Sequence, residues 1–213
     1  MSEKIKVSES DLLLVVDVQD DFCPGGALAV PHGDEVVPVI NRVCRAFVHA
    51  GLTQDWHPDG HISFASSHRG MKPFETVALP YGEQVLWPDH CVCGTAGAGF
   101  HKDLDTLRAE LILRKGFHPS VDSYSAFQEN DRSTPTGLAG YLRTRAFRRL
   151  FLAGLATDFC ILYSALDGRA EGFDVFVIED AVRGIDVGGS LGKAWKSMAE
   201  AGIRRIHEQD LLR

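Results

Sequence analysis

Residues 149–170 read RLFLAGLATDFCILYSALDGRA, and this stretch decides the fold. Its first five residues form a short, nearly continuous apolar run, which is typical of a strand buried on both faces. Residues 161–170 carry apolar side chains at helical spacing. The stretch therefore predicts a strand, a tight turn and a helix, with Cys160 at or near the first turn of that helix.

Cys160 is the first candidate for chemistry. Unpaired N–H groups and the helix dipole favour a thiolate there, so we expect its pKa to lie well below the usual value of about 8.5. The same N–H groups could hold the oxyanion that forms when a thiolate attacks a carbonyl. Iodoacetamide should then modify Cys160 ahead of the other four cysteines. The alternative is a buried, inert cysteine, because free cysteine is among the most buried residue types.

The rest of the chain continues the alternation of strands and helices. Apolar runs predict strands at 12–16, 49–53, 111–114, 174–178 and 204–206, although the run at 49–53 has little β-branched character. Helices are expected at 35–47, 137–145 and 190–201, the second of them capped by the side-chain oxygen of Thr136. Residues 54–109 form a long irregular insertion, which is usually functional in a compact domain. This alternation predicts an α/β fold with three layers, in which helices cover both faces of a parallel sheet.

The amino-acid composition indicates what kind of protein this is and which partners are disfavoured. A chain of 213 residues with 45% hydrophobic and 24% charged residues is ordinary for one globular domain, which we expect over residues 1–213. A net charge of −7 argues against nucleic acid or an anionic membrane as a partner. No apolar run reaches membrane length, and residues 1–6 contain no apolar segment of the kind that a secretion signal carries, so we expect no such signal. Five cysteines without such a signal favour reduced thiols and a cytoplasmic location.

Two charged residues stand, like Cys160, at or just beyond the carboxyl end of a predicted strand. Asp17 follows the strand at 12–16, and Lys115 follows the strand at 111–114. The carboxyl ends of parallel strands meet at one edge of the sheet, where open α/β sheets bind ligands. Asp17 could therefore act as general base for the Cys160 thiol, and Lys115 could steady both anions. Lys115 would favour the Cys160 thiolate and an ionised Asp17 would oppose it, so we expect Cys160 and Asp17 to share a proton and to titrate together. For Lys115 alone, a solvated loop lysine is the alternative.

A second cluster combines a carboxylate with imidazoles on a turn-rich loop. It comprises Asp55, His57 and His61, with His90 further along the chain. These side chains suit one divalent metal ion, with Zn²⁺, Fe²⁺ and Mn²⁺ as candidates. The spacing is not that of a HExxH helix, so a metalloprotease does not follow.

Six motifs occur along the chain between about residue 12 and residue 206. They are VDVQDDF (16–22), TQDWHPDGH (53–61), WPDHC (87–91), KG (115–116), DSYSAF (122–127) and GLATDFC (154–160). Taken together and in this order, they resemble the nicotinamidase (pyrazinamidase) branch of the isochorismatase-like cysteine hydrolases. No single motif would carry this resemblance alone.

The resemblance implies a six-stranded parallel sheet in the order 3-2-1-4-5-6 and the hydrolysis of nicotinamide to nicotinate and ammonia. Pyrazinamide would be a further substrate, and the physiological role would be nicotinamide recycling. By position in the motifs, Cys160 is the nucleophile, Asp17 the general base and Lys115 the residue that polarises and positions. We expect attack by Cys160 to form a thioester, which water then hydrolyses.

The resemblance also assigns binding residues. The residues that match the metal ligands are Asp55, His57, His61 and His90, with zinc as the first expectation and iron or manganese as alternatives. In this family the metal is thought to hold the pyridine nitrogen. Phe22 and Trp87 match the aromatic walls of the ring pocket.

Two further features concern the turn before Cys160. The resemblance implies a cis peptide bond between Leu155 and Ala156, which would aim the N–H groups of Ala156 and Cys160 at the oxyanion. Phe159 departs from the family, whose members often carry His or Tyr at this position. This departure bears on substrate preference and not on the nucleophile.

Two rival functions stand beside nicotinamide hydrolysis. One is a related amidohydrolase that acts on another small amide or on a ureide. The other is a metal-binding protein without catalysis, against which the joint presence of Asp17, Lys115 and Cys160 speaks. A homo-oligomer is compatible with the sequence, which does not decide the oligomeric state.

Overall fold

A six-stranded, all-parallel sheet forms the centre of the molecule. The computed structural model describes residues 4–212. In the order in which they lie side by side, the strands are β6 (Ala109–Lys115), β3 (His49–Asp55), β2 (Asp11–Val16), β7 (Arg149–Leu155), β8 (Asp174–Arg183) and β9 (Arg204–Ile206). Counted along the chain within this sheet, the order is 3-2-1-4-5-6, as the resemblance implied.

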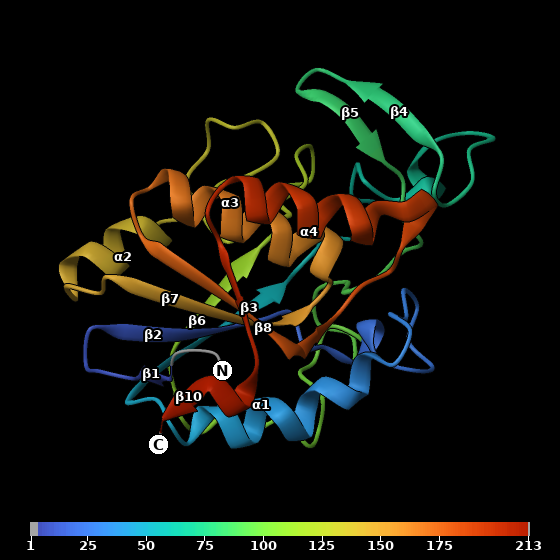
Figure 1. The fold of residues 1–213 in the computed structure, drawn as a ribbon. Helices are drawn as coiled ribbons and strands as arrows, with labels where there is room; N and C mark the ends of the chain where they lie inside the picture. Colours follow the sequence, from blue (N-terminus) through green and yellow to red (C-terminus); the bar gives the residue numbers. More distant parts are fainter. Residues whose placement is uncertain (1–3, 213) are drawn as a thin grey trace.

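Helices cover both faces of the sheet. Within the described part of the chain, the four α-helices are α1 (Val36–Cys44), α2 (Leu138–Thr144), α3 (Leu162–Ala170) and α4 (Ser190–Glu200). Figure 1 shows α1 below the sheet and α3 and α4 above it. The central strand β2 is buried along its whole length: Leu13 packs on the α1 side, whereas Leu14 packs in the cluster that holds α2, α3 and α4. Burial on both faces explains why this strand is a continuous apolar run. None of the helices among residues 4–212 is long and apolar enough to cross a membrane.

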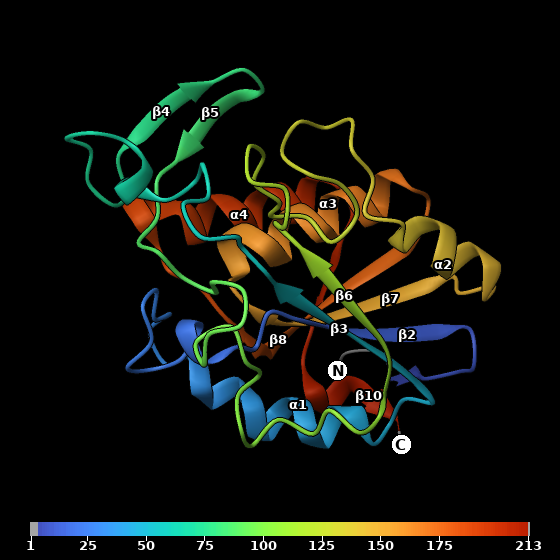
Figure 2. The ribbon, with the colours of Figure 1, turned by 180° about the vertical axis from the view of Figure 1, so that it is seen from behind.

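The insertion at 54–109 contains a hairpin that the sequence did not reveal. Strands β4 (Thr76–Leu79) and β5 (Gly82–Val85) pair antiparallel, and the hairpin projects from the body of the molecule (Figures 1 and 2). Most of its side chains are exposed or half-buried, and Gln84 is the one buried residue in the two strands. Each strand has only four residues, so the alternating Val77 and Leu79 are too few to make a recognisable strand pattern. A second short pair joins β1 (Ile5–Lys6) to β10 (Leu211–Leu212).

Several element boundaries differ from the expected ones. Strands β3 and β8 extend to Asp55 and Arg183, and α1 ends at Cys44. The N-cap of α2 is Gly137 in the left-handed region, and the Thr136 hydroxyl accepts a hydrogen bond from the N–H of the first helical residue at 3.2 Å. Short 3₁₀ turns lie at Asp20–Phe22, Gly33–Glu35, Ala65–Ser67, Val187–Gly189 and Glu208–Asp210.

The turn that carries Cys160 is wider than an ordinary helix start. Residues Thr157–Ile161 form one π-helical turn, and α3 begins only at Leu162. Such turns are often found at functional sites. Just before the turn, Gly154 has φ +114°, and a Cβ there would lie 2.1 Å from the Val16 carbonyl oxygen. Glycine is therefore required at this point, because the backbones of β7 and β2 approach too closely for a side chain.

Candidate active site

Lys115 is the centre of the site. Its ammonium nitrogen, at the carboxyl end of β6, lies 2.8 Å from Asp17 Oδ2, 2.5 Å from Asp55 Oδ1 and 3.4 Å from the Cys160 sulfur. It also donates to the Ser123 carbonyl oxygen at 2.9 Å. The side chain is buried, so the alternative of a solvated loop lysine is wrong. Burial lowers the pKa of Lys115, but the two carboxylates and the cysteine raise it well above its usual range, so the residue is a fixed cation.

Asp17 meets this cation from the central strand. It follows β2 in a left-handed conformation with φ +49°. Its Oδ1 accepts the Thr53 hydroxyl at 2.6 Å, and that hydroxyl in turn accepts the Asp17 N–H at 3.2 Å. Complete burial raises the pKa of Asp17, and the attraction of Lys115 only partly offsets this effect. A carboxylate with a raised pKa is a stronger base, which suits proton transfer from a thiol.

Cys160 differs from the expectation based on helix position. Burial raises the pKa of its thiol well above the usual range; Lys115 lowers it, whereas Asp17 and Asp55 raise it further. The expected low pKa is therefore wrong, because local helix geometry is outweighed by burial and two carboxylates. Cys160 is also buried, whereas Cys93 is exposed. We therefore no longer expect iodoacetamide to modify Cys160 first. The arrangement favours a thiol at rest that passes its proton on when it attacks.

The backbone before Cys160 has the implied geometry. The peptide bond between Leu155 and Ala156 is cis. The Ala156 carbonyl oxygen accepts the N–H groups of Phe159 and Ile161, each at 3.1 Å. Ala156 and Cys160 both line the same pocket. The oxyanion role of their N–H groups stays a prediction.

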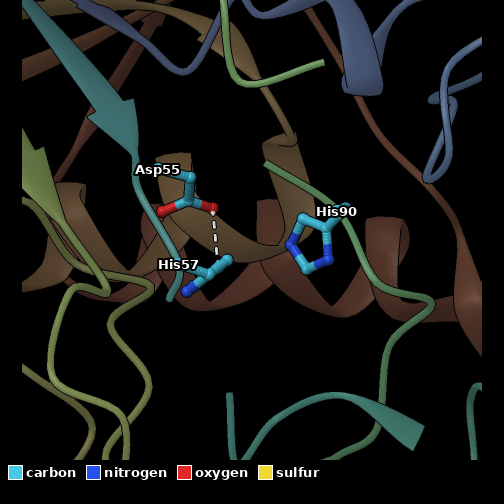
Figure 3. Close-up of side chains that lie close together, drawn as sticks. All are labelled: Asp55, His57 and His90. Atoms are coloured by element: carbon cyan, nitrogen blue, oxygen red, sulfur yellow. Dashed lines mark ion pairs between the residues drawn. The ribbon is translucent and has the colours of Figure 1, made fainter. Parts of the chain in front are cut away.

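Three of the expected metal-binding side chains form a compact group (Figure 3). One ligand atom from each of Asp55, His57 and His90 lies within 4.8 Å of the others, and all three residues are buried. The Nδ1 atom of His57 donates to the Gly116 carbonyl oxygen at 2.8 Å, and that of His90 donates to the Pro88 carbonyl oxygen at 2.7 Å. These bonds leave Nε2 as the ring atom available to a metal ion. The Nε2 atom of His57 lies 3.7 Å from Asp55 Oδ2, and Figure 3 marks this ion pair. A carboxylate and two oriented imidazoles therefore fit a divalent metal ion.

The proton affinities of two members of this group, His90 and Asp55, agree with metal binding. Burial and the neighbouring His57 lower the pKa of His90 to about 4, so His90 is neutral at pH 7. Burial alone would raise the pKa of Asp55, but Lys115 and His57 hold it below its usual range. Both residues are thus in the form that coordinates metal. Burial lowers the pKa of His57, but the adjacent Asp55 carboxylate raises it above its usual value, so a metal ion would have to displace a proton from His57.

His61 lies beside this group but presents its nitrogens differently. Its Nε2 donates to the carbonyl oxygens of His118 and Val121, at 2.9 and 3.2 Å, and its Nδ1 lies 2.8 Å from the Ser63 hydroxyl. One nitrogen or oxygen atom from each of His61, His57 and Asp122 lies within 4.8 Å of the others. The direct ligand role expected for His61 does not follow from this arrangement, because both ring nitrogens are engaged within the chain.

A pocket with about 340 Å³ of empty space, part of it open to solvent, adjoins both groups. Phe22 and Trp87 line it, as expected, together with Asp55, His57, His90 and Cys160. The further lining residues are Leu28, Asp122, Tyr124, Ala156, Phe159 and Ile185. Asp122 and Tyr124 belong to a motif noted in the sequence, but no pattern pointed to Leu28 or Ile185.

Asp158 holds one side of this pocket in place. Its carboxylate accepts the N–H groups of Ile185 and Asp186, at 3.0 and 2.8 Å, and the Ser190 hydroxyl at 2.5 Å. Three donors on one buried carboxylate tie the loop before α4 to the turn that carries Cys160. The pocket wall at Ile185 is therefore positioned from the nucleophile's own turn.

Known proteins resemble the chain over almost its whole length. The chain is 50% identical over 209 residues to a nicotinamidase of Acinetobacter baylyi, covering 98% of each chain. It is 45% identical over 179 residues to a nicotinamidase of Escherichia coli, covering 82% of this chain and 84% of the relative.

Solved structures of similar fold agree with this likeness. A nicotinamidase–pyrazinamidase of Acinetobacter baumanii superposes with a TM-score of 0.94 at 53% identity, covering 95% of this chain and 98% of that one. The PnC1 protein of L. infantum in complex with nicotinate gives 0.86 at 37% identity, covering 98% of each chain. The pyrazinamidase of Pyrococcus horikoshii in complex with zinc gives 0.75 at 36% identity, covering 93% and 99%. The isochorismatase domain model matches residues 11–209, and the chain therefore belongs to the isochorismatase domain family.

Proposed function

We propose that this chain is a nicotinamidase, which hydrolyses nicotinamide to nicotinate and ammonia and also accepts pyrazinamide. The relatives at 50% and 45% identity are nicotinamidases, and a solved relative holds nicotinate. The observation that carries the proposal is the contact of one buried lysine, Lys115, with both Asp17 and Cys160. Well-packed apolar side chains would stabilise the fold as well as or better than a buried nucleophile, base and cation do. The presence of these three groups at one pocket therefore indicates catalysis. The single-domain organisation expected for residues 1–213 is part of this proposal.

The chemistry divides between Asp17 and Cys160. Asp17 takes the thiol proton as the sulfur attacks the carboxamide carbon, and the N–H groups of Ala156 and Cys160 hold the oxyanion. Asp17 then gives the proton to the leaving nitrogen, so ammonia departs and a thioester remains. Asp17 next accepts a proton from water as the water oxygen attacks the thioester carbon. The carbon–sulfur bond then breaks to release the carboxylic acid, and Asp17 returns the proton to the Cys160 sulfur. Lys115 stabilises the carboxylate form of Asp17 between these transfers.

The shape of the pocket favours an aromatic amide. Trp87 and Phe159 meet edge to face with ring centroids 4.8 Å apart, and Phe22 lies against the ring of His90 at 5.4 Å. Aromatic walls bind a flat heteroaromatic ring through area burial and ring contacts. An aliphatic amide or a ureide would leave these walls unfilled, so the pocket favours nicotinamide over that alternative.

A divalent metal ion, with zinc as the leading candidate, completes the proposed site. Asp55, His57 and His90 would hold it, and the pyrazinamidase relative in complex with zinc supports this choice. When bound, the metal would supply a Lewis acid that holds the pyridine nitrogen of the substrate. The chain's own residues then orient the carboxamide toward Cys160.

The test is ammonia release from nicotinamide by protein of measured metal content. We expect turnover on nicotinamide and pyrazinamide, with acetamide and allantoin as the aliphatic and ureide controls. Turnover confined to a control amide would overturn the assignment of substrate. No turnover on any amide, in protein with full metal content, would favour the non-catalytic metal-binding alternative.

A further inference from the structure

Gln84, in the projecting hairpin, is buried against the pocket wall. It lies on β5 opposite Val77 of β4, and the residue is 1% exposed although most of the hairpin around it is open to solvent. Burying a polar amide is costly unless its hydrogen bonds are made. The hydrogen-bond partners of Gln84 therefore show which parts of the molecule this residue connects.

The side-chain nitrogen of Gln84 faces three oxygens. It lies 2.9 Å from Asp122 Oδ2, 2.8 Å from the Tyr124 hydroxyl and 2.7 Å from the Val85 carbonyl oxygen. A carboxylate and a carbonyl can only accept hydrogen bonds, so these neighbours require the amide nitrogen on this side. Asp122 and Tyr124 both line the pocket.

The side-chain oxygen of Gln84 is also held by two hydrogen bonds. It accepts the Tyr81 hydroxyl at 3.1 Å and the side-chain nitrogen of Asn130 at 3.2 Å. The orientation of Asn130 is set in turn, because its oxygen accepts the backbone N–H of Tyr124 at 3.1 Å. Gln84 is thus held on both ends and cannot flip without losing bonds.

The network reaches the ring pocket through one hydroxyl. The indole N–H of Trp87 donates to the Tyr124 hydroxyl at 3.1 Å, so the polar ends of two wall residues meet at an atom that Gln84 also contacts. Trp87, Tyr124 and Phe159 pack edge to face, with ring centroids 4.8 to 6.2 Å apart. The position of the aromatic wall therefore depends on a residue that does not line the pocket.

We propose that Gln84 is a positioning residue for the substrate ring, and that the β4–β5 hairpin is in this way a specificity element of the site. The inference rests on the proposed function, because it assigns the wall to an aromatic amide. Gln84 sets the wall through Tyr124 and Asp122, and it does not contact the sulfur, the base or Lys115. Its loss should weaken ring binding and leave the reacting groups in place.

The test compares Gln84→Met with Gln84→Glu and with the control Glu83→Gln in the full-length, metal-loaded protein. Methionine keeps the length of the side chain but removes the donor; glutamate replaces the donor with a carboxylate facing Asp122. Losing bonds to a carboxylate and a hydroxyl corresponds to a rise in KM for nicotinamide of about tenfold. We expect that rise for Gln84→Met, a larger one for Gln84→Glu, and kcat within about threefold of the starting value. Glu83 is exposed on the same strand, and its variant should change neither constant.

Binding without turnover gives a second readout. The dissociation constant of nicotinate, followed by tryptophan fluorescence, should rise by the same factor as KM. An unchanged KM and dissociation constant, or a fall in kcat at unchanged KM, would overturn the role of Gln84. If both Gln84 variants fail to fold, Tyr124→Phe removes the shared hydroxyl, and it must then show the same split between KM and kcat. Failure of the unaltered protein to release ammonia would instead overturn the proposed function.

Discussion

The Lys115 ammonium nitrogen lies 2.8 Å from the Asp17 carboxylate, and neither side chain has any exposed surface. The same nitrogen lies 2.5 Å from Asp55, which belongs to the metal-binding group. One cation therefore compensates both the carboxylate assigned to proton transfer and the carboxylate assigned to the metal. This sharing connects the two halves of the site, so a change at Lys115 should affect both.

Replacing Lys115 with Met should lower stability and activity together. Two buried carboxylates would lose their cation, and breaking a buried pair in this way costs about 3–5 kcal/mol. Lys115 lowers the pKa of Asp17, so without it that pKa rises further. Asp17 acts as base only when ionised, and the acidic limb of the kcat/KM profile should therefore move to higher pH. Thermal unfolding and a pH–rate profile measure the two effects; an unmoved acidic limb would contradict the assignment of Asp17 as base.

Removing the nucleophile should abolish most of the activity. Cys160→Ala is expected to lower kcat by about a thousandfold or more, because only positioning and the oxyanion donors remain. Cys160→Ser should do no better, since a hydroxyl is far harder to deprotonate than a thiol. Mass spectrometry after an acid quench should find an acyl adduct on Cys160 of the unaltered protein, provided that the thioester is hydrolysed slowly enough to accumulate. Near-normal turnover of Cys160→Ala would point to a metal-hydroxide mechanism instead.

Alkylation should follow exposure and not helix position. Iodoacetamide is expected to modify the exposed Cys93 first, because burial raises the pKa of the Cys160 thiol. In a Cys93→Ser background, modification of Cys160 should accelerate as the pH rises, and nicotinamide should slow it. Peptide mapping of each cysteine over time provides the measurement. Rapid alkylation of Cys160 at pH 6 would show that its thiol is ionised despite burial.

Two histidines of the same loop should respond differently to removal. His57→Ala is expected to lose the metal and most activity on nicotinamide, because the Nδ1 atom of His57 is held by Gly116 and its Nε2 atom lies beside Asp55 in the group with His90. His61→Ala should retain the metal, since the ring nitrogens of His61 are engaged by the chain. Elemental analysis of both purified variants decides the matter. Loss of metal from His61→Ala would restore His61 as a direct ligand.

Trp87→Ala should weaken both binding and folding. Trp87 lines the pocket but is only 3% exposed, and its ring contacts Phe74 as well as Tyr124 and Phe159. Removing a buried tryptophan costs about 3–5 kcal/mol, and the lost wall should raise KM for nicotinamide at least about tenfold. Urea unfolding and steady-state kinetics separate the two effects. A destabilised variant with unchanged KM would make Trp87 a core residue only.

The loop before α4 should loosen when Asp158 is replaced. Asp158→Ala leaves the N–H groups of Ile185 and Asp186 without their acceptor, and the expected loss of stability is about 2–3 kcal/mol. Amide exchange at residues 183–190 should accelerate more than exchange in the central strands. Because Ile185 lines the pocket, KM should rise as well. Exchange unchanged in this segment would show that the loop is held by other contacts.

Much of the fold follows from local sequence. The apolar run of β2 and the alternation of strands with helices were enough to predict a parallel sheet, because burial on both faces demands such runs. The hairpin β4–β5 could not be predicted because its strands have only four residues each and are largely exposed, which leaves too few apolar positions for a pattern. The residue types of the site, Asp17, Lys115 and Cys160, could also be named, since each lies at the carboxyl end of a strand or in the turn that follows one.

What only the tertiary structure decided is how these groups act on one another. The pKa of Cys160 depends on burial and on carboxylates at positions 17 and 55, far away in the sequence, and these outweigh its place at a helix start. The ring nitrogens of His61 are engaged by backbone from residues 118 and 121, and the wall residue Trp87 is tied to Gln84 through Tyr124. Residue type is a local property that the sequence states directly. Burial, electrostatic interaction and hydrogen bonding are sums over neighbours that only the folded chain brings together.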